Sequence, residues 1–446
     1  MIFDSESVFE DNVITVLKQH GWKDGVLRYP TEQDLLDNWK GILYRNNNDI
    51  DRLGKYPLTD GEMAQIIEQI ETLRTPLALN SFVNGRTVSI TRDNKEDVAH
   101  FGKEISLYIY DRKEIAGGKS TYQIAQQPVY PAKNKMLNSR RGDLVLLING
   151  MPLIHIELKK SGIPVSQATN QIEKYTHEGV FTGLFRLVQI FVAMNYFANP
   201  GVDKFNPSYY FHWADYNNEP ICGGQNPGKD EWKLFIGGTS GTAGLLSIPM
   251  AHQLIGFYTI ADSADGCLKV LRSYQYIAAN AISDVVRKCD WEQRPTTPGR
   301  PGGYVWHTTG SGKTMTSFKS AQLIADSHDA DKVVFLMDRI ELGTQSLKEY
   351  RSFADSETEV QGTENTGVLR DKLNSTNVND TLIVTSIQKM SNVKAGERGV
   401  TQAWLDQLAA RRIVFIVDEC HRSTFGDMLQ DIRRSFPNAL FFGFTG

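Results

Sequence analysis

Residues 304–314 read Tyr-Val-Trp-His-Thr-Thr-Gly-Ser-Gly-Lys-Thr, the most informative segment in the second half of the chain. An apolar run enters a glycine-rich turn, which a lysine and a threonine close ahead of a helix-length segment. In a phosphate loop, backbone N–H groups converge on a β-phosphate, the lysine adds positive charge and the hydroxyl holds Mg2+. Such loops usually begin with glycine, where this chain has His307. The sequence predicts that ATP and Mg2+ bind a loop formed by Thr309, Gly310, Ser311, Gly312, Lys313 and Thr314.

A second motif downstream fits the same chemistry. Residues 413–421 read Ile-Val-Phe-Ile-Val-Asp-Glu-Cys-His, an apolar strand that ends in two carboxylates. Beside a phosphate loop, Asp418 would complete the Mg2+ shell, and Glu419 would orient and deprotonate the attacking water. A solvated acidic pair at a strand end is the competing interpretation, and the phosphate loop upstream makes it the weaker one.

Apolar, β-branched runs alternate with helix-length segments throughout this half of the chain. Continuous apolar strands that alternate with helices are typical of a parallel sheet covered on both faces. We therefore expect an α/β domain with a parallel sheet, whose strands lie at 304–309, 332–338, 381–386, 413–419 and 439–445.

The first half of the chain has a different pattern. A helix is expected over residues 7–19, followed by strands around an antiparallel hairpin, which indicates a mixed sheet. Residues 217–244 are rich in glycine and proline, so we place a domain boundary near residue 250 and expect domains at 1–250 and 251–446. The strands of the first domain are expected at 86–91, 104–110, 144–148, 153–159, 188–196 and 208–213.

The hairpin is the most informative part of the first half. Residues 143–159 read Asp-Leu-Val-Leu-Leu-Ile-Asn-Gly-Met-Pro-Leu-Ile-His-Ile-Glu-Leu-Lys, and Asn-Gly between two apolar runs is a strong hairpin signal. A strict two-residue turn would place Asp143 opposite Ile156, whereas one extra residue or one bulge would place it opposite Glu157. We expect the second register, because it gives one sheet face that is fully apolar. Asp143, His155, Glu157 and Lys159 then share the other face.

Two carboxylates and a lysine at one sheet edge suggest a divalent metal site. Asp143 and Glu157 offer hard oxygen ligands suited to Mg2+, and the carbonyl of Leu158 is a plausible third ligand. Lys159 could position the water that attacks a phosphodiester. From this motif alone, a surface network of ion pairs on an amphipathic strand is an equally good interpretation.

The hairpin and the helix after it resemble the RecB-type family of PD-(D/E)xK nucleases. Gln171 and Tyr175 lie four residues apart on one helix face, and they match the QxxxY element that lines the active site in that family. The resemblance also implies that a glutamate of the first helix approaches the metal; the spacing favours Glu10 over Glu6. Gly142 replaces the proline that usually precedes the first aspartate, a position that supplies no metal ligand.

Residues 271–446 resemble the first RecA-like domain of superfamily-2 helicases and translocases. The resemblance implies that Gln275, in Arg-Ser-Tyr-Gln at 272–275, reads the adenine edge of ATP, and that segments 333–345 and 385–389 contact the DNA backbone. In these motors a second RecA-like domain supplies an arginine finger worth about 10^3–10^5 in rate. The sequence stops at Gly446, so we expect that domain to be absent and the chain alone to hydrolyse ATP negligibly.

The order of nuclease and motor, and the wording of their motifs, closely resemble the restriction (R) subunit of type I restriction-modification enzymes. The resemblance implies Mg2+-dependent cleavage of double-stranded DNA, ATP-driven translocation, and assembly with methyltransferase (M) and specificity (S) subunits. One alternative is another nuclease–helicase fusion, type III-like or RecB-like, although type III relatives usually place the nuclease after the motor. The other is a non-catalytic DNA-binding or translocation module with structural carboxylates.

Composition agrees with a globular chain of two or three domains. The 446 residues are 41% hydrophobic and 22% charged, with a net charge of -4, so contacts with nucleic acid must come from local basic grooves. No stretch approaches the roughly 18 apolar residues of a membrane helix, and the four cysteines form no CxxC pair. We expect a cytoplasmic protein that makes no membrane contact.

Overall fold

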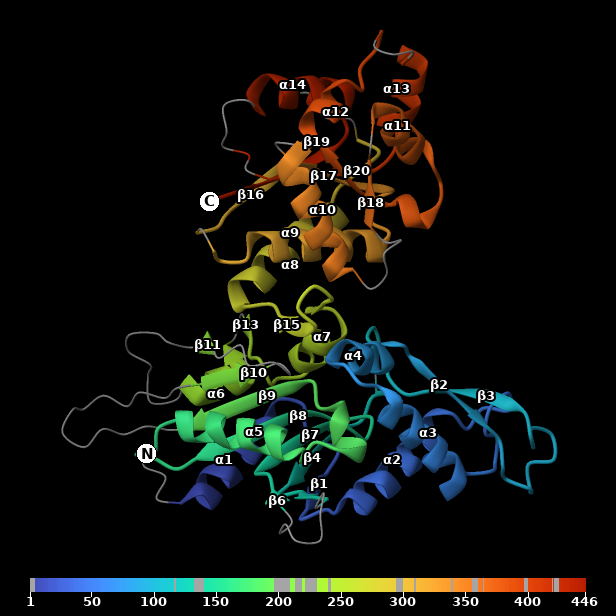
Figure 1. Ribbon diagram of the computed structural model, residues 1–446, viewed down its shortest axis with the longest axis vertical. Coiled ribbons are helices and arrows are strands. Elements are labelled where there is room, and N and C mark those ends of the chain that lie inside the picture. The colour runs from blue at the N-terminus through green and yellow to red at the C-terminus, as the bar shows by residue number, and fades with distance from the viewer. Residues whose placement is uncertain are drawn as a thin grey trace. The chain divides into compact units, whose positions relative to one another are not determined.

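The computed structural model divides into two compact units (Figure 1). The first comprises residues 1–259 and 266–270, and the second comprises residues 260–265 and 271–446. The division falls between residues 259 and 271, in the segment that contains β14 (Thr259–Asp262) and β15 (Cys267–Val270). The structure describes residues 5–446 except 116–117, 132–139, 196–208, 213–218, 221–230, 240–241, 294–299, 309, 338–339, 355–359, 364, 397–399, 419 and 421–424.

The first unit is built around a seven-stranded mixed sheet. In sheet order its strands are β1 (Val26–Arg28), β4 (Tyr122–Gln126), β7 (Leu144–Ile148), β8 (Met151–Lys159), β9 (Ile190–Asn195), β10 (Tyr209–His212) and β11 (Glu219–Pro220). Strand β7 runs antiparallel to both β4 and β8, whereas β8 and β9 are parallel. The central strands β7, β8 and β9 are buried along their whole length, which is why they are apolar at nearly every position.

Helices and short strands complete the first unit. The helices are α1 (Glu6–Gln19), α2 (Glu32–Asn46), α3 (Asp60–Thr72), α4 (Pro76–Asn84), α5 (Ser166–Glu178), η1 (Gly183–Leu187), α6 (Glu231–Gly237) and α7 (Met250–Gly256). The short strands are β2 (Thr87–Thr91), β3 (Glu104–Tyr108), β5 (Val129–Tyr130), β6 (Arg140–Arg141), β12 (Gly238–Thr239) and β13 (Thr242–Ala243). Helix α5 packs on the sheet through Ala168 and Ile172, which join Phe191 and Ala193 of β9 in one buried cluster. The same sheet face carries the odd-numbered residues of the end of β8, because His155 pairs with Phe191 and Glu157 with Ala193.

The hairpin between β7 and β8 has the expected register. Asn149 and Gly150 occupy the turn with φ of 53° and 84°, as a two-residue type I′ turn requires. Ile148 pairs with Met151, but Leu144 pairs with Ile156, so a bulge shifts the register by one residue between them. Continuing this register by one residue past β7 places Asp143 opposite Glu157, which confirms the register inferred from the packing of the apolar face.

The second unit contains a six-stranded sheet in which every pairing is parallel. In sheet order its strands are β16 (Arg300–Trp306), β21 (Leu440–Thr445), β20 (Ile413–Val417), β17 (Lys332–Met337), β19 (Leu382–Ser386) and β18 (Val360–Gly362). The predicted fold class, a mixed-sheet α/β unit followed by a parallel-sheet α/β unit, is confirmed.

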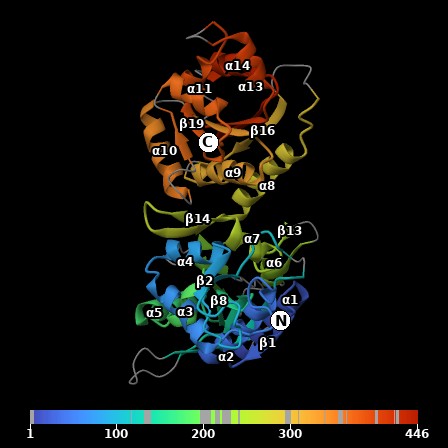
Figure 2. The ribbon, with the colours of Figure 1, turned by 90° about the vertical axis from the view of Figure 1, so that its right-hand side faces the viewer.

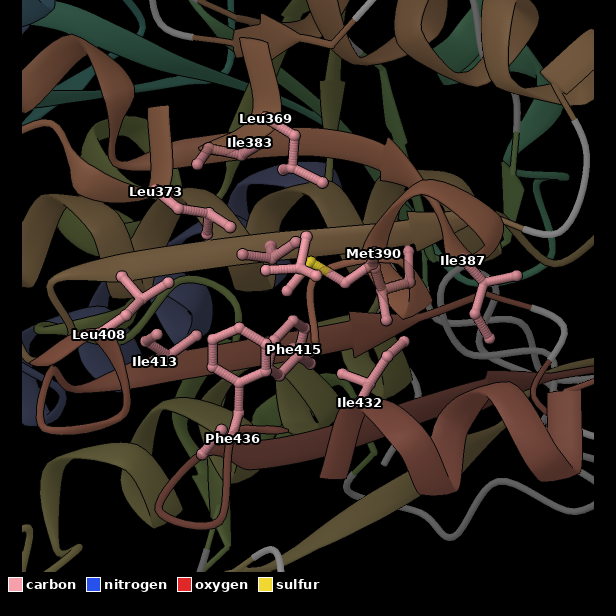
Figure 3. Close-up of a cluster of buried hydrophobic side chains, with 14 of the residues drawn as sticks. Leu369, Leu373, Ile383, Ile387, Met390, Leu408, Ile413, Phe415, Ile432 and Phe436 are labelled. Atoms are coloured by element: carbon pink, nitrogen blue, oxygen red, sulfur yellow. The ribbon is translucent and has the colours of Figure 1, made fainter. Parts of the chain in front are cut away.

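Helices cover both faces of the parallel sheet. They are α8 (Ser273–Arg287), α9 (Lys313–Ser327), α10 (Ile340–Phe353), α11 (Thr366–Asn374), η2 (Val378–Asp380), α12 (Ile387–Ser391), α13 (Gln402–Ala409) and α14 (Phe425–Ser435). Helices α8, α9 and α10 lie on one side of the sheet and α11 to α14 on the other (Figures 1 and 2). On the second side, leucines of α11 and α13, Ile432 of α14 and Phe436 just after it form one buried cluster with Phe415 of β20 (Figure 3). On the first side, Phe335 of β17 packs against Tyr350 of α10, with ring centroids 4.4 Å apart.

None of the helices within the described ranges is long and apolar enough to cross a membrane.

Candidate functional site

The carboxylates of Asp143 and Glu157 meet at the end of the β7–β8 hairpin. Asp143 precedes the first ladder residue of β7, and its Oδ2 accepts a 2.6 Å hydrogen bond from the backbone N–H of Leu158 on the facing strand. Besides burial, the charge of Glu157 raises the pKa of Asp143, as expected for two carboxyl groups that lie close together. The bulge is what brings the two acids together, because the strict register would have placed Asp143 opposite Ile156.

Burial makes this pair of acids hard to ionise. The Glu157 side chain is 1% exposed, and this burial raises its pKa to about 7, although the ammonium of Lys159 acts in the opposite direction. Burial and the nearby charge of Glu157 raise the pKa of Asp143 well above its usual range. Two carboxyl groups so close together in a buried site are costly as a structural element. A divalent cation would displace the proton that the raised pKa values favour, and would neutralise both charges.

Lys159 lies at the same edge of the sheet. Its Nζ donates a 3.0 Å hydrogen bond to the carbonyl of Leu158 and lies 3.6 Å from Glu157 Oε1. The same ammonium is 3.7 Å from Glu6 Oε1, on the first turn of α1. The lysine is therefore held between the candidate metal ligands and the solvent-facing Glu6.

Glu10 occupies a different position from Glu6. Its side chain is 2% exposed, and it accepts hydrogen bonds from Gln126 Nε2 at 2.6 Å and Gln127 Nε2 at 3.2 Å. Burial raises the pKa of Glu10, and its charge in turn contributes to the raised pKa of Asp143. Sequence reasoning missed both glutamines; the available signal was the polar pair at the end of β4.

Gln171 and Tyr175 contact each other, as their spacing on α5 predicts. Gln171 Nε2 donates a 2.7 Å hydrogen bond to the Tyr175 hydroxyl, which donates at 3.1 Å to the carbonyl of Arg141, two residues before Asp143. Burial and the charge of Glu157 raise the pKa of Tyr175 to about 12, so the phenol stays protonated at neutral pH. The helix therefore places one amide and one hydroxyl beside the carboxylates.

His155 lies behind Glu157 on the same strand. It is fully buried, and its Nδ1 is 2.7 Å from the Tyr130 hydroxyl. Burial lowers the pKa of His155 to about 4, so the ring is neutral at neutral pH. Its other nitrogen, Nε2, is 3.3 Å from Glu157 Oε2.

The site provides oxygen ligands for one hard cation. No cluster of three or more His, Cys, Asp or Glu side chains suited to a metal occurs in the described part of the chain. The available donors are the two carboxylates, the Leu158 carbonyl and water, a set that suits Mg2+, which normally keeps several waters. The Oε1 atom of Glu157 lies on the side of Lys159, whereas its Oε2 atom is buried without a hydrogen-bond partner. The residues present therefore fit the cation that the sequence predicts.

The second unit brings the phosphate-loop lysine to the strand-end aspartate. Lys313 Nζ lies 3.0 Å from Asp418 Oδ1, and both side chains are partly exposed. Strands β16 and β20 lie on either side of β21 in the parallel sheet. The loop after β16 and Asp418 after β20 therefore meet at the carboxyl-terminal edge of the sheet. Thr314, half-buried in the first turn of α9, follows the lysine. The predicted Thr309 and Glu419 lie outside the described residues.

The phosphate loop is tied to the start of α8. Gln275 is 3% exposed; its Oε1 accepts from the Arg272 N–H at 2.9 Å and its Nε2 donates to the Gly312 carbonyl at 3.1 Å. Tyr274 donates a 2.7 Å hydrogen bond to the carbonyl of Ser311 in the same loop. Gly310 and Gly312 adopt left-handed backbone angles, with φ of 77° and 80°. The amide of Gln275 therefore holds the loop, and adenine recognition by this residue stays a prediction.

Comparisons with known proteins follow this division of the chain. Residues 4–198 match the family described as the type I restriction enzyme R protein N terminus, and residues 274–446 match the SWI2/SNF2 ATPase family. A Staphylococcus saprophyticus protein named as a type I restriction enzyme endonuclease subunit is 34% identical over 100% of this chain and 43% of its own length. A Mycoplasma pneumoniae protein named as the C-terminal part of a putative subunit of this kind is 37% identical over 38% of this chain and 80% of its own length. The chain belongs to the family of type I restriction enzyme endonuclease subunits.

The chain spans less than half the length of the relatives that match it from end to end. The Staphylococcus aureus (strain COL) relative, also named as a type I restriction enzyme endonuclease subunit, is 34% identical over 100% of this chain and 43% of its own length. Among solved structures, T4 UvsW aligns with a TM-score of 0.29 and 16% identity over 42% of this chain and 32% of that one, a likeness too low to support an argument. The family membership therefore rests on the sequence matches.

Proposed function

We propose that the first unit is a Mg2+-dependent endonuclease that hydrolyses double-stranded DNA, and that the second unit is part of the ATP-driven motor that supplies it with DNA. The observation that carries the nuclease proposal is the meeting of Asp143 and Glu157 beside Lys159, in a buried site that raises the pKa of both acids. A structural ion network would keep such acids exposed or pair each with its own cation. Here one lysine faces two acids.

Each residue of the hairpin has a separate task in this proposal. Asp143, Glu157 and the carbonyl of Leu158 would hold Mg2+, which when bound polarises the scissile phosphate and neutralises its developing charge. Lys159, whose ammonium already donates to the Leu158 carbonyl, would orient the attacking water beside the phosphate. Gln171 and Tyr175 would donate hydrogen bonds to the DNA backbone from α5.

The second unit would bind Mg2+ and ATP through the phosphate loop. The loop N–H groups and Lys313 would contact the phosphates, Thr314 and Asp418 would hold the cation, Gln275 would orient the loop and meet the base, and Glu419 would activate water. The proximity of Lys313 to Asp418 supports this arrangement, because both groups must face the same phosphates. We also propose that hydrolysis needs the arginine finger of a second RecA-like domain, as in related motors.

The family membership extends the proposal to partners. We propose that the chain acts within an assembly with the methyltransferase and specificity subunits, in the cytoplasm where the DNA lies. Target recognition would then belong to the specificity subunit, and the nuclease would show no sequence preference of its own.

The experiment is cleavage of circular DNA by the assembled full-length enzyme with Mg2+ and ATP. We expect Asp143→Ala and Lys159→Ala each to reduce cleavage by at least about 10^3-fold while ATP hydrolysis continues. Lys160→Ala is the matched control, because Lys160 is the exposed neighbour of Lys159 and should leave both activities unchanged. Equal cleavage by the parent and by both site variants would favour the non-catalytic DNA-binding module instead.

A further inference from the structure

Behind the paired acids of the hairpin lies a row of three buried polar groups. The Tyr130 hydroxyl is 2.7 Å from His155 Nδ1, and His155 Nε2 is 3.3 Å from Glu157 Oε2. Tyr130 and His155 are 0% exposed and Glu157 is 1% exposed, so water does not reach the row from outside. His155 Nε2 and Glu157 Oε2 face each other as the two buried polar atoms of this row that have no hydrogen-bond partner.

The chemistry of the three groups fixes the direction of donation. A neutral imidazole has one N–H donor and one acceptor nitrogen. An ionised Glu157 can only accept a hydrogen bond, so the proton of His155 must lie on Nε2 for the 3.3 Å contact to become a hydrogen bond. Nδ1 is then an acceptor, and the Tyr130 hydroxyl is the donor that it meets. Donation therefore runs from Tyr130 to His155 to Glu157.

Gly142 provides the space for this row. A Cβ atom at position 142 would lie 2.5 Å from the Tyr130 hydroxyl and 2.8 Å from Cε1 of His155. Gly142 immediately precedes Asp143. The absence of a side chain at this position leaves room for the Tyr130–His155 pair, which lies beside Glu157. This explains the departure from the proline that usually precedes the first aspartate in the related nucleases.

We propose that His155, with its tautomer fixed by Tyr130, is a positioning residue that donates from Nε2 to Glu157 and orients that carboxylate for the divalent cation. The proposal rests on the metal site of the proposed nuclease. It assigns part of the affinity of that site for the cation to Tyr130 and His155, which are not metal ligands. Hydrogen bonds to the outer side of ligating groups typically contribute 10- to 100-fold in metal affinity.

The first unit contains a matched control for this pair. The Tyr122 hydroxyl lies 2.9 Å from Nδ1 of His252, and Nε2 of His252 lies 3.0 Å from the backbone carbonyl of Asp111. This second Tyr–His pair is also buried, but His252 Nε2 meets a backbone carbonyl instead of a site carboxylate. A general loss of stability from cutting a buried Tyr–His pair should therefore appear in both, and a loss of metal affinity only in the first.

The test is titration of the 446-residue chain with Mn2+, followed by electron paramagnetic resonance of the free ion. We expect Mn2+ binding that Asp143→Ala removes, and a Kd that rises about 10- to 100-fold in His155→Leu. His155→Gln should recover to within about threefold of the parent, because the glutamine amide can donate from nearly the position of Nε2. His252→Gln should bind Mn2+ like the parent.

A second readout covers the case in which His155→Leu does not fold. With 15N-labelled histidine, and His155→Gln to assign the signal, the unsubstituted chain should show the Nε2–H tautomer of His155 when Mg2+ is added. Tyr130→Phe should reduce that tautomer preference and raise the Kd for Mn2+ by several-fold.

The outcomes separate the two proposals. Asp143-dependent Mn2+ binding that is unchanged in His155→Leu, or an Nδ1–H tautomer in the Mg2+-loaded chain, overturns the role of His155 and leaves the nuclease proposal intact. Absence of Mn2+ binding that depends on Asp143 overturns the metal site itself, and the positioning role with it.

Discussion

The backbone N–H of Leu158 donates a 2.6 Å hydrogen bond to the carboxylate of Asp143. This contact replaces the next rung of the β7–β8 ladder with a side chain, so the ladder ends where the acids begin. Asp143 is thereby fixed against the strand that carries Glu157 and Lys159. The geometry of the site consequently depends on the hairpin register.

Ionisation of Glu157 should destabilise the metal-free chain. The pKa of this carboxyl is raised from 4.5 to about 7 in the folded chain, so the folded state binds the proton more tightly than the unfolded state. Its contribution to the free energy of unfolding is present below pH 4.5 and is lost as the pH rises through about 7. Glu157→Gln should not show this loss. Between pH 4.5 and pH 8, the free energy of unfolding of the parent should therefore fall by about 1–3 kcal/mol more than that of Glu157→Gln.

Urea unfolding with a chelator present, at pH 4.5 and at pH 8, measures this difference. The exposed Glu68→Gln serves as the control, and its pH profile should match that of the parent. Mg2+ should restore stability to the parent at pH 8 but not to Glu157→Gln, because a ligand stabilises the state that binds it. Parallel pH profiles for the parent and Glu157→Gln would contradict the buried, proton-holding acid.

Replacement of Gly142 should damage the first unit in two separable ways. Gly142→Ala puts a Cβ atom 2.5 Å from the Tyr130 hydroxyl, so the aromatic ring must shift. Gly142→Pro adds the loss of the 3.2 Å hydrogen bond from its N–H to the Pro128 carbonyl. We expect losses of about 1–3 kcal/mol for alanine, with proline larger, measured by chemical unfolding.

A double variant identifies the cause. Tyr130→Phe removes the hydroxyl that the new Cβ would meet, so Gly142→Ala should cost less in that background than in the parent. Additive losses in the double variant would show that the tyrosine hydroxyl does not restrict position 142.

The hairpin turn should tolerate no side chain at position 150. Gly150 has a φ of 84°, and a Cβ there would lie 2.8 Å from the Trp39 Cα atom of α2. Gly150→Ala should therefore cost about 2–4 kcal/mol, from the left-handed backbone and from the close approach. Gly102→Ala is the control, because its φ is 73° and no other heavy atom lies within 4 Å of the added Cβ.

Thermal unfolding followed by circular dichroism compares the two glycine variants. The control should lose only the backbone contribution of about 1 kcal/mol. If Gly150→Ala and Gly102→Ala unfold at the same temperature, the close approach of the turn to α2 does not exclude a side chain at position 150.

Loss of Lys313 should weaken nucleotide binding and leave the fold intact. Its ammonium lies 3.0 Å from Asp418 Oδ1, and the side chain is partly exposed. Lys313→Ala should weaken binding of a fluorescent ATP analogue by more than about tenfold, and should abolish ATP-dependent restriction in the full-length enzyme. Lys288→Ala, at an exposed lysine that pairs with Asp284 on α8, should leave both unchanged. Restriction that survives Lys313→Ala would rule out the motor interpretation.

Features with local causes could be predicted from the amino-acid sequence. The Asn149-Gly150 turn, the apolar strands of the parallel sheet and the phosphate loop before α9 all follow from a few adjacent residues, because turn angles and strand periodicity are properties of neighbouring positions. The fold class and the register of the hairpin were predicted correctly for that reason. The register needed one further argument, the packing of a whole apolar face, and the bulge satisfied it.

The distant residues that complete the site became known only from the packing of the folded chain. Strand β4 is short and polar at its ends, so the sequence pattern did not identify it as a strand. It places Gln126 beside Glu10, which lies 116 positions away in the sequence. The pairing of Tyr130 with His155 crosses 25 positions and depends on a glycine whose importance lies in the missing Cβ atom. Such contacts depend on how sheet and helices pack in three dimensions, and burial then sets the protonation of each acid. Local sequence patterns carry neither kind of information.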